Sequence, residues 1–189
     1  MTELAGILLA AGSATRFGSA KLRHPLSDGV SIGAAAATAL LQALPNTVAV
    51  VQPGDRALIE VFSAFGVKVV ENALADEGMG TSLAAGVDAT SGAAGWLIAL
   101  ADMPWVQAAT ITALADRLKN GASIVAPVYE GQRGHPVGFS SRWLQQLLAL
   151  SGDRGARELL ANHPEEVELF NTKDAGVLQD IDFPRDLKR

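Results

Sequence analysis

The alternation of short apolar runs with longer segments of helical period is the feature that most restricts the fold of this 189-residue chain. Runs such as Gly6 to Ala10 and Trp96 to Leu100 carry no charged or strongly polar residue, which is typical of strands covered on both faces. Segments of helical character follow, as at Ser31 to Leu44 and Asp55 to Phe65. This pattern predicts βαβ units and a three-layer α/β/α sandwich around a mostly parallel sheet.

Further strands are expected at Thr47 to Val51, Val67 to Glu71, Ser123 to Val128 and Glu166 to Phe170, with another helix at Ser82 to Thr90. The run Val137 to Phe139 follows the strand before it too closely for a crossover helix, so we expect it to be antiparallel and the sheet to be mixed. We find no fixed-period repeat and no Pro/Ser-rich linker, which predicts a single domain over residues 1–189.

Charge and cysteine content exclude several function classes. A net charge of -5 without a long Lys/Arg run argues against binding to a polyphosphate backbone, so no nucleic-acid partner is expected. The chain has no cysteine, so a metal must be held by oxygen or imidazole ligands. The apolar stretch from Leu4 to Ala11 is too short to span a bilayer and follows Glu3 rather than a basic region, which predicts a cytoplasmic protein without a membrane segment.

A loop of small residues with two cations follows the first predicted strand, where open α/β sheets bind their ligands. Closely approaching amides and fixed cations suit phosphate oxygens. The predicted triphosphate cradle consists of Leu9, Ala10, Ala11, Gly12, Ser13, Arg16 and Lys21. The loop differs from the dinucleotide fingerprint in glycine spacing and from the Walker loop because Leu22 follows Lys21. A structural turn with two solvated cations is the alternative.

Asp102 follows the predicted strand Trp96 to Ala101 and precedes Pro104, so its carboxylate is expected beyond the carboxyl end of a central strand. Magnesium takes oxygen ligands and commonly combines one or two carboxylates with substrate phosphates, which suits this position. The alternative for Asp102 is a cap on the following turn.

Two further segments are candidates for ligand contact. Glycines flank Met79, and Thr81 and Ser82 open a predicted helix, so amides and hydroxyls there could face a base or ribose; a plain helix N-cap explains the same residues. Gly134 lies between Arg133 and His135 in a turn-rich stretch before the antiparallel strand. A lone histidine is more often structural than a ligand contact, so both interpretations stay open for this stretch.

Five motifs, in order, resemble those of the nucleotidyltransferases that attach CMP or GMP to molybdopterin. They are Leu9 to Lys21, Glu77 to Leu83, Ala101 to Pro104, Gly131 to Val137 and Asp180 to Pro184. The resemblance implies a Rossmann-like nucleotidyltransferase fold. It assigns magnesium to Asp102 and Asp182, although a structural role is the alternative for Asp182. It also implies that a loop with Gly80, Thr81 and Ser82 binds the nucleobase.

The same resemblance places Arg133, Gly134 and His135 at the acceptor, with the loop from Asp153 to Arg157 nearby. The chain departs from the family pattern near its carboxyl end, where Phe183 and Arg185 replace a threonine and an acidic residue. This change affects the acceptor side more than the metal side.

The resulting hypothesis is an enzyme that transfers CMP from CTP to a phosphorylated acceptor, molybdopterin, and releases pyrophosphate. Arg16, Lys21 and Asp102 would be its catalytic residues, with Mg²⁺ as the cofactor and a molybdoenzyme as a possible recipient of the product. CTP is expected because the Ala10-Ala11-Gly12 version of the loop resembles the cytidylyl branch. The alternatives are a transferase of the same fold acting on GTP or a sugar phosphate, and a non-catalytic module that delivers a cofactor.

Overall fold

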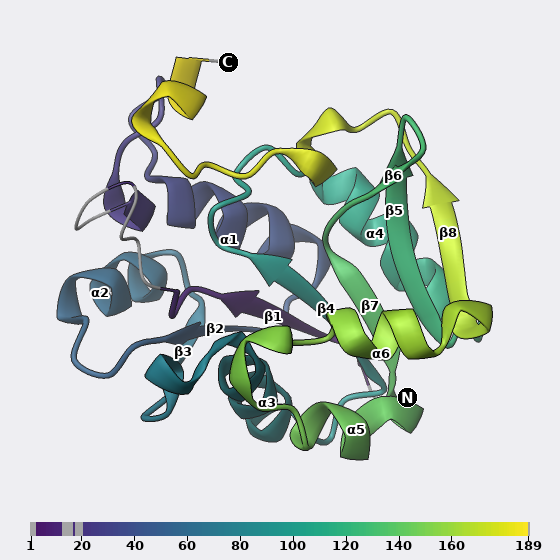
Figure 1. Ribbon diagram of the computed structural model, residues 1–189. Helices are drawn as coiled ribbons and strands as arrows, with labels where there is room; N and C mark the ends of the chain where they lie inside the picture. Colours follow the sequence, from purple (N-terminus) through teal and green to yellow (C-terminus); the bar gives the residue numbers. More distant parts are fainter. Residues whose placement is uncertain (1–2, 13–16, 18–20, 189) are drawn as a thin grey trace.

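The computed structural model describes residues 3–12, 17 and 21–188, and these form a three-layer α/β/α sandwich (Figure 1). Within this part of the chain one mixed sheet has eight strands, in the order β3-β2-β1-β4-β7-β5-β6, with β8 paired to β5. The strands are β1 (Ala5–Leu9), β2 (Thr47–Val51), β3 (Lys68–Glu71), β4 (Gly95–Leu100), β5 (Ile124–Tyr129), β6 (Gln132–Arg133), β7 (Val137–Ser140) and β8 (Val167–Asn171). The predicted fold class is confirmed.

Helices cover both faces of the sheet (Figure 1). One layer contains α1 (Ile32–Ala43), α2 (Arg56–Ala64) and α4 (Ala108–Lys119), and the other contains α3 (Met79–Ala89), α5 (Leu144–Leu148) and α6 (Arg157–Asn162). Successive side chains of β1 pack against the two helical layers alternately. Ile7 lies in one hydrophobic core with Leu83 of α3, and Leu8 lies in a second core with Leu40 of α1. All four side chains are buried, which explains why β1 is apolar at consecutive positions.

The strands predicted from apolar runs are present within one or two residues at each end, and the short strand at 137–140 is antiparallel to β4 as expected. The predicted start of α3 at Ser82 is wrong, because the helix begins at Met79 after Gly78, whose φ of 118° lies in the region open to glycine. Thr81 and Ser82 therefore lie inside the first turn, and neither is the N-cap.

The central position of β1 creates a crevice at the carboxyl ends of the strands. The chain first builds outward from β1 through β2 and β3, and then places β4 on the other side of β1, parallel to it. Such a topological switch point is where open α/β sheets bind ligands, outside the carboxyl ends of the strands. Leu9 and Leu100 are register partners at this edge.

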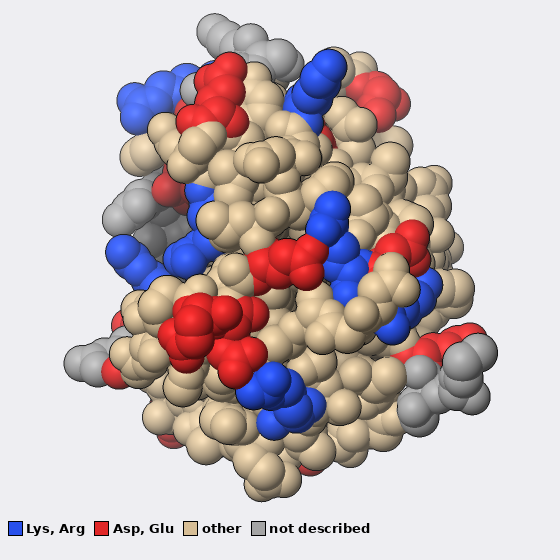
Figure 2. Space-filling model, turned by 90° about the vertical axis from the view of Figure 1, so that its right-hand side faces the viewer, with Lys and Arg blue, Asp and Glu red and all other residues tan. Residues whose placement is uncertain are grey.

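The side of the molecule that holds the edge strand β8 carries basic and acidic groups interspersed (Figure 2). Arg117 of α4 pairs with Glu168 of β8, and Arg142 pairs with Glu166 at 2.7 Å. A mixture of signs on this face does not attract a polyphosphate backbone. Among the residues that the structure describes, no helix is long and apolar enough to cross a membrane.

Candidate functional site

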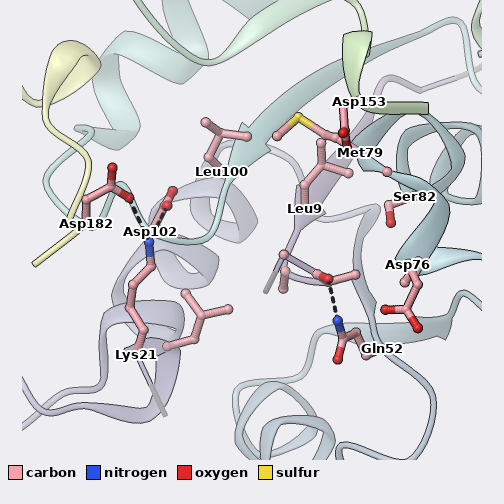
Figure 3. Close-up of a pocket in the computed structure, with 16 residues that line it drawn as sticks. Leu9, Lys21, Gln52, Asp76, Met79, Ser82, Leu100, Asp102, Asp153 and Asp182 are labelled. Atoms are coloured by element: carbon pink, nitrogen blue, oxygen red, sulfur yellow. Dashed lines mark hydrogen bonds and ion pairs between the residues drawn. The ribbon is translucent and has the colours of Figure 1, made fainter. Parts of the chain in front are cut away.

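A cavity of about 380 Å³ opens at the switch point between β1 and β4 (Figure 3). Eight residues predicted to form the site line it: Leu9, Ala10, Ala11, Gly12, Lys21, Ser82, Asp102 and Asp182. Ser13 and Arg16, also predicted for the cradle, lie outside the described residues. The ends of two neighbouring strands, the start of α3 and the carboxyl-terminal segment thus meet at one cavity.

Lys21 lies between two carboxylates on one side of this cavity (Figure 3). Its Nζ donates a hydrogen bond to Asp102 Oδ2 at 2.7 Å and lies 3.5 Å from Asp182 Oδ1. The side chain of Lys21 is 11% exposed, that of Asp102 25% and that of Asp182 40%, so the group is partly withdrawn from water. Asp102 and Asp182, 80 positions apart in the sequence, therefore converge on a single positive charge.

The backbone fixes both carboxylates. Asp102 lies in the turn directly after β4, and the amide of Ile181 donates to its carbonyl oxygen at 3.0 Å. The amides of Asp182 and Phe183 both donate to Asp186 Oδ2, at 3.0 and 2.8 Å. The segment 181–186 is thus held against the end of β4, which brings Asp182 beside Asp102.

This oxygen pair fits a hard divalent cation. The two carboxylates already converge on an ammonium, and Mg²⁺ is commonly held by one or two carboxylates while substrate phosphates and water supply its other ligands. The described ranges contain no group of three or more His, Asp or Glu side chains arranged to hold a metal. Asp102 and Asp182 would therefore hold Mg²⁺ together with a bound triphosphate rather than as a closed cage.

The described part of the predicted cradle follows the end of β1. Ala10 donates its amide to Val50 and Ala101 donates to Leu9, which ties this strand end to both neighbours. Gln52 Nε2 donates to the Ala11 carbonyl at 3.1 Å and also lines the cavity. Sequence analysis missed Gln52, although it follows β2 directly and the strand-end argument used for Asp102 applies to it.

The opposite side of the cavity contains Asp76, Met79 and Asp153 (Figure 3). A Cβ on Gly78 would lie 2.3 Å from the Gly152 carbonyl carbon, so glycine lets the turn at 152–154 pack against the start of α3. This contact brings Asp153 to the cavity. Asp76 lines the cavity from the short 3₁₀ turn Ala75–Glu77, and the sequence analysis did not predict this position.

Gly80 and Thr81 do not belong to the cavity lining. Thr81 is 8% exposed, and its Oγ1 lies 2.7 Å from the Leu74 carbonyl oxygen and accepts a hydrogen bond from Asn72. A Cβ on Gly80 would lie 2.8 Å from the Ser151 carbonyl carbon. These contacts are structural: they hold the turn before α3 and the turn at 152–154 in place.

Arg133, Gly134 and His135 lie outside the cavity lining, next to the site rather than in it. The amide of His135 donates to the Val177 carbonyl at 2.9 Å, and a Cβ on Gly134 would lie 2.1 Å from that same oxygen. Burial lowers the pKa of His135, and Arg133 acts in the same direction, whereas the charges of Asp102 and Asp180 oppose the shift. The buried Nδ1 of His135 has no partner among the described residues.

The chain is similar to known proteins in sequence and in fold. The model of a family described as the MobA-like NTP transferase domain matches residues 6–167. Nicotine blue oxidoreductase of Paenarthrobacter nicotinovorans is 28% identical over 97% of this chain and 94% of its own length. The bifunctional protein GlmU of Sinorhizobium fredii is 31% identical over 80% of this chain but only 34% of its own length.

Among solved structures, Rv0371c of Mycobacterium tuberculosis superimposes with a TM-score of 0.85 at 26% identity, covering 100% of this chain and 96% of that one. A second structure of Rv0371c, described as a complex with manganese, gives a TM-score of 0.81 at the same identity, over 100% of this chain and 97% of that one.

Proposed function

Because this chain belongs to the family of the MobA-like NTP transferase domain, we propose that it transfers CMP from CTP to a phosphorylated acceptor, molybdopterin, and releases pyrophosphate. The observation that carries the proposal is the convergence of Asp102 and Asp182 on Lys21 at the switch point of the sheet. Two carboxylates and a fixed cation at that edge are groups for handling a metal and phosphates.

The chemistry is an in-line displacement at the α-phosphorus of CTP. An oxygen of the acceptor phosphate forms the new P–O bond, the bond from the α-phosphorus to the bridging oxygen breaks, and pyrophosphate leaves. Lys21 and Arg16 stabilise the charge on the triphosphate, and the amides from Ala11 to Ser13 orient it. Asp102 and Asp182 would hold Mg²⁺, which would supply positive charge to the phosphate oxygens.

The opposite side of the cavity is assigned to the nucleobase. The carboxylates of Asp76 and Asp153 accept hydrogen bonds, so they favour a base with an exocyclic amino group, which cytosine and guanine carry and uracil lacks. The small Ala10-Ala11 pair then favours CTP over GTP, by the resemblance to the cytidylyl branch. Ser82, which lines the same cavity, contacts the base or the ribose. In this proposal Asp153 serves the donor rather than the acceptor.

The acceptor is assigned to the side of Asp102 where Arg133 and His135 lie. The influence of Asp102 on the pKa of His135 supports their proximity. The guanidinium of Arg133 suits an anionic acceptor. Gly134 lets the backbone beside it pack against Val177, which holds Arg133 and His135 in place. A recipient molybdoenzyme would take the finished cofactor from this side.

The 28% identity with nicotine blue oxidoreductase, which extends over 97% of the chain, favours a second candidate, an oxidoreductase with the same fold. A lysine between two carboxylates suits the handling of a metal and of phosphate charge, and the family match covers residues 6–167, so the transferase is the better-supported function. A non-catalytic delivery module is a third candidate, and it would bind nucleotide without turning it over.

Two measurements test the proposal. Thermal shift with each of the four nucleoside triphosphates plus Mg²⁺ should show the largest stabilisation with CTP, about 2.7 kcal/mol at roughly 100 times its dissociation constant. Pyrophosphate release should then require CTP, Mg²⁺ and molybdopterin together. Binding of CTP without pyrophosphate release would favour the delivery module, and stabilisation by none of the four would refute nucleotide transfer.

A further inference from the structure

The ammonium of Lys21 lies between the two carboxylates that the proposed function assigns to a divalent cation. Its Nζ lies 2.7 Å from Asp102 Oδ2 and 3.5 Å from Asp182 Oδ1, and Figure 3 shows the three side chains pointing toward one another. The lysine side chain is 11% exposed, in contrast to Lys119, which is 59% exposed and pairs with Asp116 on the surface. The contact is therefore part of the built site rather than a loose surface ion pair.

A metal and this ammonium compete for the same oxygens. A divalent ion bound by Asp102 and Asp182 would lie within a few ångströms of Nζ, where two positive charges repel strongly. In the nucleotide-free protein Lys21 would then have to leave both carboxylates while remaining largely buried, and a buried charge that loses its partner is costly. Metal alone offers no replacement partner for the ammonium.

A triphosphate removes this obstacle. Lys21 lines the same cavity as Ala11 and Gly12, so phosphate oxygens bound in the predicted cradle would lie within reach of its flexible four-carbon side chain. The ammonium would then exchange carboxylate for phosphate, which would leave Asp102 and Asp182 to hold the metal. Every charge keeps a partner in this exchange, which is not the case when the metal binds alone.

We propose that Lys21 is a resident cation that keeps divalent metal out of the Asp102–Asp182 pair until a nucleoside triphosphate draws it away. The substrate is consequently taken up as a metal–triphosphate complex, and the free protein has little affinity for the metal. This inference rests on the proposed function for the triphosphate site and the metal pair. It goes beyond that function by fixing the form in which the nucleotide binds.

The test is a titration of the nucleotide-free protein with Mn²⁺, with free Mn²⁺ followed by electron paramagnetic resonance. Lys21→Met keeps the length of the side chain and removes its charge, and Lys21→Gln is a second variant with a polar end. Suppose that the ammonium leaves the pair in about a tenth of wild-type molecules or fewer. Both variants should then have a dissociation constant for Mn²⁺ that is lower than that of the wild type by about tenfold or more. Lys119→Met is the matched control and should leave Mn²⁺ affinity unchanged.

The double variant Lys21→Met with Asp182→Asn shows whether the gain arises at this pair, because it should lose the added affinity. Equal and tight Mn²⁺ binding by wild type and both Lys21 variants would overturn the resident-cation role while leaving the metal pair intact. Failure of both Lys21 variants to bind Mn²⁺, with melting curves showing that they are folded, would overturn the inference and the metal assignment of the proposed function together.

Discussion

Replacing Asp102 by asparagine removes a negative charge at the end of β4 and leaves the size of the side chain nearly unchanged. The carbonyl oxygen of residue 102 would still accept the amide of Ile181, a contact of 3.0 Å that does not depend on the side chain. Lys21 would keep Asp182, which lies 3.5 Å from Nζ. The variant is therefore expected to fold and to retain the cavity.

The expected loss of activity is much larger than the expected loss of stability. Breaking a buried pair outright costs roughly 3–5 kcal/mol, but here the lysine keeps a partner and the pair is partly exposed, so about 1–2 kcal/mol is expected. In a chain of this length that lowers the melting temperature by roughly 2–8 °C. Removing one of the two carboxylates that would hold Mg²⁺ beside the reacting phosphates is expected to reduce turnover on the order of a hundredfold or more, about 2.7 kcal/mol in the activation free energy.

The assay compares pyrophosphate release over a Mg²⁺ titration with melting curves of the same preparations. Asp116→Asn is the matched control, because Asp116 pairs with Lys119 at 3.2 Å on the exposed surface and should change neither measurement. An Asp102→Asn enzyme with wild-type turnover and an unchanged Mg²⁺ requirement would show that Asp102 neither holds the metal nor acts on the triphosphate.

Three further predictions follow from the site. In competition binding with Mg²⁺, CTP should displace a labelled nucleotide at lower concentration than GTP, and the reverse order would place the chain in the guanylyl branch. His135→Ala should raise the Michaelis constant of the acceptor at least about tenfold, because a hydrogen bond to a charged group contributes ~1.5 kcal/mol or more. The same variant should leave the Kd of CTP unchanged. Parallel losses of acceptor binding, CTP binding and melting temperature would indicate a structural histidine. Burial lowers the pKa of His135 in the folded state, so below about pH 6.5 the unfolded chain binds more protons than the folded one and the free energy of unfolding falls as the pH decreases. The melting temperature of His135→Ala should therefore fall less with decreasing pH than that of the wild type. An equal pH dependence of the two melting temperatures would contradict this prediction.

Sequence reasoning succeeded where local pattern and strand order determine position. The apolar runs that became β1 and β4 are covered on both faces, and this burial is what makes them readable as strands. Asp102 could be placed because the end of a central strand in an open sheet is a ligand position whatever the surrounding loops do. Gln52 could have been placed by the same argument and was overlooked.

Positions that depend on contacts between distant segments could not be predicted. Glycine is a poor helix former, yet Gly80 lies in the first turn of α3 and is required there, because a Cβ would meet the Ser151 backbone at 2.8 Å. Asp153 reaches the cavity through the packing of Gly152 against Gly78, which no local pattern reveals.

The helix α4 was not predicted either, although a local pattern indicates it, because Ile111, Leu114, Ala115 and Leu118 have helical spacing.

The carboxyl-terminal segment explains why Asp182, one half of the proposed metal pair, cannot be located from the position of a strand end. Asp182 lies beyond residue 167, where the family match ends, and no strand leads directly to it. Its position follows from an anchor at Asp174, which is 3% exposed and accepts hydrogen bonds from the Gln107 amide at 2.9 Å and the Thr110 hydroxyl at 2.8 Å. Close packing adds to this anchor, since a Cβ on Gly176 would lie 2.2 Å from the Trp105 carbonyl oxygen. The turn after β8 is thereby fixed to the start of α4, which directs the following residues back across the end of β4. Asp102 is positioned by its own strand, whereas Asp182 is positioned by tertiary contacts of the last segment, so the carboxylate pair is complete only when that segment has docked.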